Sequence, residues 1–327
     1  MAIYFYKSES GDGWQNLAMD AYFLEHLSPE DICLYFYINK NAVIIGKNQN
    51  AWKECNLDAM EQDGVQLVRR HTGGGAVYHD EGNLNFSFIM GEDEYDLARQ
   101  MRVILRTVEK FGLHAELSGR NDILVDGRKF SGNAFGVAHG MRSHHGTILV
   151  NANLSKLGNY LNVSKKKIAS KGVSSVRARV CNLAELAPEI TVPQVEEALK
   201  AAFAEEYGTY TPYVFTEAEK AEIAKIYETQ ASWEWRLGKA PKFDYALEER
   251  LSFGEIQLYF GLEQGQITEM KIYSDALDTT ITERIAKALL GARFVREEMA
   301  DRLFAAAEAQ QDPVLQELGK YISSVEL

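Results

Sequence analysis

The chain has 327 residues, of which 46% are hydrophobic, and a formal net charge of −12 at pH 7. This length exceeds the usual size of one domain, so we expect a large domain followed by a smaller one. The acidic balance argues against sequence-independent binding to nucleic acid, because that binding needs a basic surface for the phosphates.

The cysteines and the N-terminal residues exclude further classes of protein. Cys33, Cys55 and Cys181 are far apart and form no CxxC pair, so we expect neither a disulfide framework nor a zinc site. The first residues contain no basic segment followed by an apolar one, and the sequence has no run of about 18 apolar residues. We therefore expect a cytoplasmic protein that is neither secreted nor membrane-spanning.

The N-terminal part alternates between strand and helix patterns. Hydrophobic periodicity predicts a strand over residues 2–6, a helix over 14–27, strands over 32–38 and 42–45, a helix from 51 to 60, and strands over 65–68 and 84–89. Asp12 or Gly13 would cap the first helix, and Asn50 the second. Residues 39–41 read Asn-Lys-Asn, which is turn chemistry, so we expect the strands on either side of them to form a hairpin.

The middle of the chain predicts a helix over residues 95–111 that ends at Gly112, and a short buried strand over 123–125. Asp126-Gly127 is a strong hairpin-turn signal, so the chain should return as a strand over 128–135. A further strand is expected over 147–151 and surface helices over 192–207 and 217–227. The segment 231–241 contains two tryptophans, which we expect to pack on the core of the first domain.

Beyond Phe243 the pattern changes. Strands over 255–260 and 267–273 are expected to form an antiparallel pair, followed by helices over 282–290 and 297–309. Roughly 80 residues of this kind can form a small α+β domain. We therefore expect one domain over residues 1–245 and a second over 246–327.

A glycine-rich connection is the first candidate binding element. Residues 68–90 read VRRHTGGGAVYHDEGNLNFSFIM, with three adjacent glycines between two apolar runs. Such a backbone can turn a series of N–H groups toward an anion and also lets another segment approach closely. Arg69 and Arg70, if they continue the strand, point to opposite faces, so only one should reach a ligand. The alternative is a surface turn with two solvated arginines.

Lys129 is the second candidate. It lies on the return strand after the Asp126-Gly127 turn, and the small residues Gly132 and Ala134 follow it. Combined with the glycine loop, it describes a site that joins two negatively charged reactants. A cation between a carboxylate and the α-phosphate of a nucleotide cancels their repulsion and stabilises the charge that develops during transfer. The alternative is a surface lysine with a solvated head group.

Other residue combinations point less clearly to a reaction. The sequence contains no GxxxxGK[ST] phosphate loop, no GxSxG elbow and no HExxH helix. His71 and His79 flank the glycine loop without the spacing of a metal site, and the adjacent His144 and His145 would face opposite ways on a strand. Asp122, just before the strand at 123, is a candidate ligand for Mg²⁺ that bridges nucleotide phosphates, or else part of a turn.

Five motifs follow one another along the chain: RRHTGGGAVYHDEGNLNFSF, GRNDILVDGRKFSGNA, HHGTILVNANLSKLGNYLN, KGVSSVRARVCNL and SWEWRLGKAP. Together they resemble the lipoate–protein ligase A family, in the bacterial form with a C-terminal accessory domain. The resemblance implies an α+β protein: a mixed β-sheet catalytic domain of the biotin/lipoate ligase type, flanked by helices, and a small α+β C-terminal accessory domain.

The resemblance also implies a reaction in two steps. Lipoate and MgATP would give enzyme-bound lipoyl-AMP and pyrophosphate. The lipoyl group would then pass to a specific lysine of an apo lipoyl domain, in a 2-oxoacid dehydrogenase E2 subunit or in the glycine-cleavage H protein. ATP, Mg²⁺ and lipoate are the small molecules implied, and neither nucleic acid nor a membrane is an expected partner.

The resemblance assigns the family's functional positions to residues in and near the two candidate elements. The ATP-binding positions fall on Arg70, Gly75, Ala76, Val77, Tyr78 and Lys129. Lipoate would meet Lys129, Gly74, His79 and Gly132. Thr72 and Asn133 replace serines common in related enzymes, which affects only fine specificity. The lysine run at 165–167 and the segment 171–173 fall where the family has a mobile loop that covers the adenylate.

Two other functions are compatible with this fold. An octanoyl- or lipoyl-transferase would use a cysteine acyl-enzyme and no ATP, with Cys33, Cys55 or Cys181 as its nucleophile. A non-catalytic binder of lipoate or its adenylate would act as a sensor. The intact glycine loop and the C-terminal domain favour the ligase, and no DNA-binding helix pair or basic face accompanies the site.

Overall fold

The computed structural model describes residues 1–119, 121–162, 180–237, 245–263 and 265–325. It divides into two compact units, which we describe separately. Unit 1 contains residues 1–45, 51–71 and 76–236, and unit 2 contains residues 46–50, 72–75 and 237–327. The lysine run at 165–167 and the segment 171–173 lie outside the described residues.

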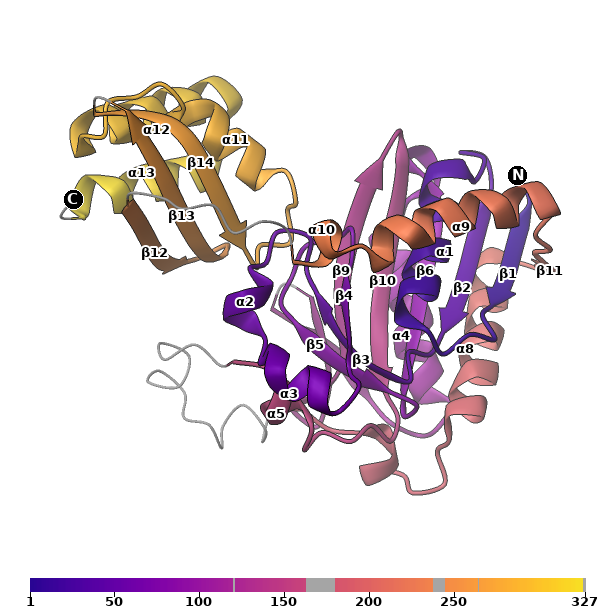
Figure 1. Cartoon of the computed structure of the whole chain (residues 1–327). Coiled ribbons are helices and arrows are strands. Elements are labelled where there is room, and N and C mark those ends of the chain that lie inside the picture. Colours follow the sequence, from indigo (N-terminus) through magenta and orange to yellow (C-terminus); the bar gives the residue numbers. More distant parts are fainter. Residues whose placement is uncertain (120, 163–179, 238–244, 264, 326–327) are drawn as a thin grey trace. The chain divides into compact units, whose positions relative to one another are not determined.

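A mixed sheet forms the centre of unit 1 (Figure 1). In the described residues it has eight strands, in the order β11 (Thr211–Pro212), β1 (Ile3–Lys7), β2 (Ile32–Tyr37), β6 (Asn83–Gly91), β10 (Met141–Leu149), β9 (Arg128–Ala138), β8 (Asp122–Val125) and β7 (Ala115–Ser118). Strand β1 is parallel to β11 and β2, and every later neighbour along the order is antiparallel.

A second sheet of unit 1 corrects the predicted hairpin at residues 39–41. It consists of β4 (Gln66–Arg69), β3 (Asn41–Ile45) and β5 (Val77–Asp80). Strand β2 pairs with β1 and β6 in the large sheet, whereas β3 pairs with β4 and β5, so the hairpin prediction was wrong. The reason is that Asn39 is fully buried and accepts a hydrogen bond from the Asn16 side chain, 2.9 Å away. It therefore anchors the crossing between two sheets and does not form a solvated turn.

Eight helices lie in the described residues of unit 1, and the longer ones begin at polar caps. They are α1 (Gly13–His26), α2 (Ala51–Glu54), α3 (Leu57–Gln62), α4 (Leu97–Glu109), α5 (Leu157–Tyr160), α8 (Val192–Tyr207), α9 (Glu217–Ala231) and α10 (Trp233–Arg236), with 3₁₀ turns at Glu92–Glu94 and Leu183–Glu185. Asp12 caps α1 and Asp96 caps α4. The helix predicted from 51 to 60 is two short helices, because Asn56 caps α3 anew.

The predicted strand at 147–151 is longer and begins earlier. Strand β10 starts at Met141, so His144 and His145 lie within the sheet between β6 and β9. The turn before it, at His139 and Gly140, has positive φ at both residues (49° and 78°), as a tight hairpin turn requires. This register fixes which of the two histidines faces each side of the sheet.

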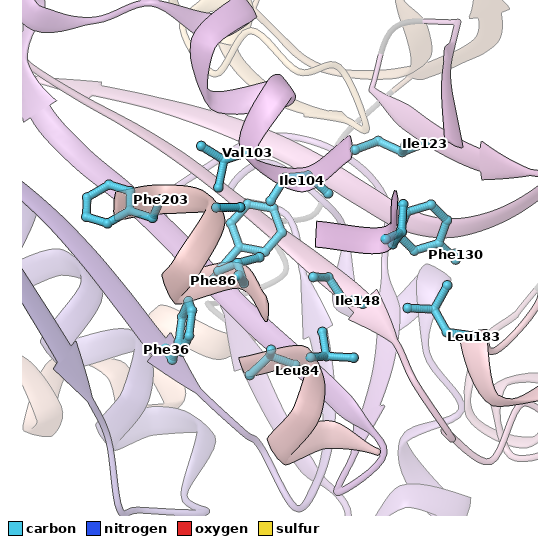
Figure 2. Close-up of a cluster of buried hydrophobic side chains, with 14 of the residues drawn as sticks. Phe36, Leu84, Phe86, Val103, Ile104, Ile123, Phe130, Ile148, Leu183 and Phe203 are labelled. Atoms are coloured by element: carbon cyan, nitrogen blue, oxygen red, sulfur yellow. The ribbon is translucent and has the colours of Figure 1, made fainter. Parts of the chain in front are cut away.

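An apolar core fills the side of the sheet that helices α4 and α8 cover. Figure 2 draws 14 of its side chains and labels Phe36, Leu84, Phe86, Val103, Ile104, Ile123, Phe130, Ile148, Leu183 and Phe203. We call this side the apolar face, defined by Phe36, Leu84, Phe86, Phe88 and Ile148. Burial of such side chains stabilises the fold by about 1.5–3 kcal/mol each. A second apolar cluster of unit 1 includes Leu17, Phe23 and Ile89.

The expectation that both tryptophans at the end of unit 1 pack on its core was wrong for Trp233. Of the two tryptophans in the segment 231–241, Trp235 donates its ring N–H to the Arg69 carbonyl oxygen over 2.9 Å. Trp233 has 41% of its surface exposed and does not pack into the core. The two side chains differ because they are two positions apart on the short helix α10, and so lie on different sides of it.

Unit 2 has its own sheet and core. The sheet is antiparallel, in the order β12 (Tyr245–Leu251), β13 (Gly254–Glu263) and β14 (Gln266–Ser274), and the helices that follow are α11 (Ile281–Leu289), α12 (Arg296–Gln310) and α13 (Pro313–Ser324). The predicted pair β13 and β14 is confirmed, and β12 and α13 add to it. Side chains such as Leu258, Phe260 and Leu303 are fully buried in a core of this unit. None of the described helices of either unit is long and apolar enough to cross a membrane.

Candidate active site

The second face of the large sheet carries polar side chains that are buried. Along β6, the apolar Leu84, Phe86 and Phe88 alternate with Asn85 and Ser87, which project to the opposite side. We call that side the polar face, defined by Tyr35, Tyr37, Asn83, Asn85, Ser87, His145 and Thr147. A strand buried on both sides with one polar row is unusual for a core, because buried polar groups need partners.

The polar face continues across five neighbouring strands. Tyr37 of β2 pairs with Asn85 of β6, and Asn85 pairs with Thr147 of β10. The Thr147 hydroxyl oxygen accepts a hydrogen bond from the Gly132 N–H of β9, 3.2 Å away, and Gly132 pairs with Asp122 of β8. Four strand spacings of about 4.8 Å make this row roughly 19 Å long. An elongated ligand would fit along such a row.

Lys129 lies at one end of the row. Its ammonium nitrogen is 2.6 Å from the Asp122 carboxylate, and the two side chains are 31% and 39% exposed. The register of β8 and β9 shifts between Ile123 and Leu124, so Phe130 is the extra residue of a bulge. A Cβ atom on Gly132 would lie 2.9 Å from the Lys129 ammonium, so the absence of a side chain there leaves room for it.

Arg70 lies near the other end of the polar row, beside Tyr37. As expected, the side chains of Arg69 and Arg70 have different partners. Arg69 donates to the carbonyl oxygens of Trp235 and Arg236, at 2.8 and 2.7 Å. Arg70 is buried, donates to the Ile44 carbonyl oxygen over 3.2 Å, and interacts electrostatically with Tyr37. Burial lowers the pKa of Arg70 to about 10, so its guanidinium stays charged at neutral pH. The Arg69 side chain therefore binds helix α10, whereas the Arg70 side chain interacts with Tyr37 of the polar face.

His79 of β5 is beside Arg70 and presents a buried donor. The Asn39 side-chain amide donates to His79 Nδ1 over 3.1 Å, which places the ring proton on Nε2. That Nε2 atom is buried and makes no hydrogen bond among the described residues. Burial, followed by the charges of Arg70 and His145, lowers the pKa of His79 to about 3, so the ring is neutral. An unpaired N–H next to a guanidinium suits an anionic or carbonyl oxygen.

Asp20 of α1 supplies a buried carboxylate to the same face. It accepts a short hydrogen bond from the Ser87 hydroxyl, and His145 Nδ1 is 3.4 Å from its other oxygen. Sequence reasoning missed Asp20, Tyr37, Ser87 and His145 as site residues. The signal was present in the segment NLNFSF, residues 83–88, whose polar and apolar residues alternate inside a run that reads as buried.

The glycine loop belongs to unit 2, where it contacts the segment after β14. The Gly74 N–H donates to the Ala276 carbonyl oxygen over 3.1 Å, with φ of 94° at Gly74. The Gly73 backbone lies so close to Ala276 and Leu277 that a Cβ atom would overlap their carbonyl oxygens. A Cβ on Gly75 would meet nothing within 4 Å. Gly73 thus allows a close approach of another segment and Gly74 adopts a positive φ, so the loop shows one of the two uses that the sequence suggested.

Three further predicted ATP positions follow the loop. Ala76, Val77 and Tyr78 belong to unit 1, and Val77 and Tyr78 begin β5. The Tyr78 hydroxyl donates to the Asn41 side-chain oxygen over 2.9 Å, and burial raises the Tyr78 pKa to about 12. Tyr78 also lines an open hollow of about 740 Å³ beside β5. Gly74 and Gly75 belong to unit 2, and the binding of one nucleotide by all these positions stays a prediction.

The part of the chain that the structure describes offers no ready-made metal site. Among the described residues, no three His, Cys, Asp or Glu side chains come close enough together to hold a metal ion. Asp122, the predicted Mg²⁺ ligand, is paired with the ammonium of Lys129. A single carboxylate that already neutralises an ammonium does not fit a resident metal ion. Magnesium at Asp122 therefore stays a prediction, and the ion would have to arrive with nucleotide phosphates.

The cysteines are poorly suited to nucleophilic chemistry. Cys33, Cys55 and Cys181 are all buried. Burial is the largest cause that raises the pKa of each thiol, to about 12 for Cys55. The nucleophile of an acyl-cysteine mechanism is the thiolate, which needs a lowered pKa and access to substrate. This geometry speaks against the transferase reading.

Comparison with known proteins identifies two matched regions. Residues 12–204 match the model of the lipoyl protein ligase A/B catalytic domain, and residues 240–312 match that of the bacterial lipoate protein ligase C-terminus. The chain is similar to P. falciparum LipL1, solved in complex with lipoate, with 30% identity, a TM-score of 0.86, and coverage of 99% of this chain and 100% of that one.

Two other solved structures match most of the chain. The bipartite lipoate protein ligase of Thermoplasma acidophilum, described with its E2 lipoyl domain, has 28% identity and a TM-score of 0.66, and the match covers 75% of this chain and 100% of that one. A lipoate-protein ligase A bound with ATP has 28% identity and a TM-score of 0.65, over 73% of this chain and 99% of that one.

Proposed function

This chain belongs to the lipoate–protein ligase family, in the form with a bacterial C-terminal domain, and from this we propose that it activates lipoate with ATP and transfers the lipoyl group to a lysine of an acceptor protein. The observation that carries the proposal is Lys129, whose ammonium is held by Asp122 at the end of a buried polar row. The relatives support the choice of ligands, since one was solved with lipoate and another with ATP.

The first half-reaction joins two anions. A carboxylate oxygen of lipoate attacks the α-phosphorus of ATP, the bond from that phosphorus to the bridging oxygen breaks, and pyrophosphate leaves. The Lys129 ammonium would lie between the carboxylate and the α-phosphate, where it lowers their repulsion and stabilises the negative charge that builds up on the phosphoryl oxygens. Asp122 would keep that ammonium in place before the substrates arrive. Magnesium, when bound with the nucleotide, supplies further charge neutralisation on the phosphates.

Arg70 and His79 add fixed donors to the same face. We assign Arg70 to the nucleotide, together with Gly75, Ala76, Val77 and Tyr78. Lipoate would contact Lys129, Gly74, His79 and Gly132. The unpaired His79 N–H is buried, so a ligand oxygen that accepts from it removes the cost of an unsatisfied donor, which is about 1–3 kcal/mol.

The second half-reaction needs an acceptor amine. The neutral amine of the acceptor lysine attacks the carbonyl carbon of lipoyl-AMP, an amide bond forms, AMP leaves, and the amine releases a proton. We propose apo lipoyl domains as acceptors, of the kind found in 2-oxoacid dehydrogenase E2 subunits and in the H protein. The presence of a lipoyl domain with the T. acidophilum relative supports this choice.

One assay separates this function from its competitors. The purified protein is incubated with ATP, Mg²⁺, lipoate and an apo lipoyl domain, and pyrophosphate and the acceptor mass are measured. We expect pyrophosphate release that depends on lipoate, and a lipoyl mass gain on the acceptor. Absence of both from well-folded protein rejects the ligase. Mass gain without ATP, through an acylated cysteine, would favour the transferase, and tight lipoyl-AMP binding without transfer would favour a sensor.

A further inference from the structure

A chain of buried hydrogen bonds lies on the apolar face, behind the end of the site that holds Lys129. His144 of β10 is fully buried and pairs with Phe88 of β6, so it points to the apolar face. Its ring is 5.6 Å from the ring of Phe86, 5.6 Å from that of Phe88 and 5.1 Å from that of Phe135. A polar ring among three aromatic rings needs partners for both nitrogens, and the reaction described above does not use it.

Both ring nitrogens of His144 meet side-chain amides. Nε2 is 2.8 Å from the Asn133 side-chain oxygen, and Nδ1 is 2.9 Å from the side-chain oxygen of Gln100 on α4, whose NH₂ group donates to the Met90 sulfur over 3.4 Å. Asn133 and Gln100 are both buried. Burial lowers the pKa of His144 to about 3, so the ring is neutral and has a single N–H. Such a ring can donate to only one of the two amide oxygens, so the other amide must present its NH₂ group instead.

The orientation of Asn133 decides which nitrogen carries the proton. Its side-chain NH₂ group donates to the Asn121 backbone oxygen over 3.0 Å, so its oxygen must face His144. The proton is then on Nε2, and Nδ1 needs a donor. A half-turn of the Gln100 amide supplies its NH₂ group as that donor, because the two ends of an amide have nearly the same shape, and it replaces only the bond to the Met90 sulfur. This gives a directed chain from Gln100 through His144 to Asn133.

Asn133 holds the segment that contains Asp122. The Asn133 N–H donates to the Asn121 backbone oxygen over 2.9 Å, and the Asn121 side chain donates back to the Asn133 backbone oxygen over 2.6 Å. These bonds fix the start of β8 against β9, directly before the carboxylate that pairs with Lys129. A Cβ on Gly146 would lie 2.6 Å from the Asn133 side-chain oxygen, so this glycine keeps the path open.

We infer that His144 is a positioning residue for the adenylate-forming step: held by Gln100, it orients Asn133, which fixes Asn121 and so sets where Asp122 holds the Lys129 ammonium. The inference rests on the proposed function for its catalytic consequence only. The hydrogen-bond chain itself connects an apolar-face histidine to a polar-face lysine through the thickness of the sheet. A displacement of about 1 Å at a reacting group can cost on the order of a hundredfold in rate.

The test compares three variants with the wild type. His144→Leu keeps a bulky apolar side chain but removes both bonds, and His144→Gln keeps a donor toward Asn133. Ile104→Ala is the matched control, because this side chain is fully buried in the same core, on the same helix as Gln100, and makes no hydrogen bond of its own. The readouts are thermal stability, kcat and KM of lipoate-dependent ATP–pyrophosphate exchange, and the rate at which acetic anhydride acetylates Lys129, followed by peptide mass spectrometry.

We expect His144→Leu to lower kcat by at least about tenfold with little change in KM, and to change the acetylation rate of Lys129. His144→Gln should restore most of both. Ile104→Ala should lose at least as much stability and keep the wild-type kcat and acetylation rate. If His144→Leu matches Ile104→Ala in both readouts, the residue is only structural and the inference falls. Gln100→Leu, which breaks the chain one step earlier, replaces His144→Leu if that variant does not fold.

The acetylation readout separates this inference from the proposed function. If the wild type forms no lipoyl-AMP, the proposed function fails, and the acetylation rates alone decide the inference. A changed rate in His144→Leu but not in Ile104→Ala then supports it, and equal rates overturn it. An independent check is the ¹⁵N spectrum of the imidazole, which should show a neutral ring protonated at Nε2. A proton at Nδ1 would contradict the direction of the chain.

Discussion

The two faces of the large sheet use the same strands for opposite purposes. On β6, Leu84, Phe86 and Phe88 enter the apolar core, and Asn85 and Ser87 project to the polar face between them. The apolar side chains gain stability from burial alone, whereas the polar ones must be paired to offset their desolvation. Pairing is nearly complete: Ser87 donates to Asp20, and the Asn85 amide donates to the Tyr37 backbone oxygen over 3.1 Å. A strand that is buried on both sides can therefore carry the polar residues of a site on one face while its other face packs in the core.

The largest effect should come from the apolar face. Phe86→Ala removes a fully buried ring and should lower the free energy of unfolding by about 3–5 kcal/mol. Ser87→Ala, one residue later, removes one donor to Asp20 and should cost only about 1–3 kcal/mol. Urea denaturation of both variants measures this. Equal losses would show that the two faces contribute alike to stability.

On the polar face, the largest effect on catalysis should come from Lys129, at the end of the polar row. Lys129→Ala should slow adenylate formation by about 10²–10³-fold, because an ammonium that stabilises developing charge is lost. Its unfolding midpoint should stay near that of the wild type, since the side chain is 31% exposed. Lys110→Ala is the control, because Lys110 forms a comparable ion pair with Glu205 away from the polar face. Normal turnover by Lys129→Ala would remove this lysine from the mechanism.

Alanine substitutions of two glycines, one on each face, should affect stability and activity differently. Gly146→Ala places its Cβ against the Phe86 ring and the Asn133 amide on the packed side, and should cost about 1–3 kcal/mol of stability. Gly132→Ala meets only the flexible end of Lys129, so stability should change by less than about 0.5 kcal/mol. Its adenylate formation should nevertheless fall by about tenfold, because the ammonium is displaced. Thermal unfolding and pyrophosphate release together test this pair.

The smallest effect is the pH dependence that one histidine on each face contributes. Burial lowers the pKa of His79 and of His144 from 6.5 to about 3. In the unfolded chain both rings take up protons near pH 6.5, so the folded state loses stability as the pH falls from there toward 3. Each should contribute about 1.4 kcal/mol per pH unit in that window.

Urea denaturation between pH 7 and pH 5 would measure this slope. His79→Gln and His144→Gln should each flatten it by about one histidine's share, whereas His114→Gln, at an exposed position, should leave it unchanged. A slope that survives the replacement of both buried rings would mean that other groups cause it.

Local signals in the sequence predicted much of the fold. The Asp126-Gly127 turn was expected and has φ of 51° and 72°, so the return strand with Lys129 followed from it. Strand β12 was missed because YALEERL mixes charges with apolar residues and shows no clear period of two. Helix α13 was missed although its start carries two signals, an Asp312 cap and Pro313 in the first turn.

The candidate site was harder to predict because its contacts are distant in the sequence. Arg70, His79 and Lys129 were chosen from local patterns and from the family resemblance. The bulge at Phe130 and the pair of Lys129 with Asp122 depend on a register shift that no local pattern encodes. The approach of Ala276 to Gly73 joins residues about two hundred positions apart, and only the folded chain shows it.

The path of the chain between the two units has a consequence for attempts to divide the protein. Residues 46–50 and 72–75 leave unit 1 and belong to unit 2, where Ser274 N–H donates to the Asn48 carbonyl oxygen over 2.8 Å and Gly74 N–H donates to Ala276. If the chain were divided near residue 237, both short segments would stay with the N-terminal part and lose their hydrogen-bond partners. The C-terminal part is thus no detachable module, and exchanging it with that of a relative would require grafting three pieces of sequence at once.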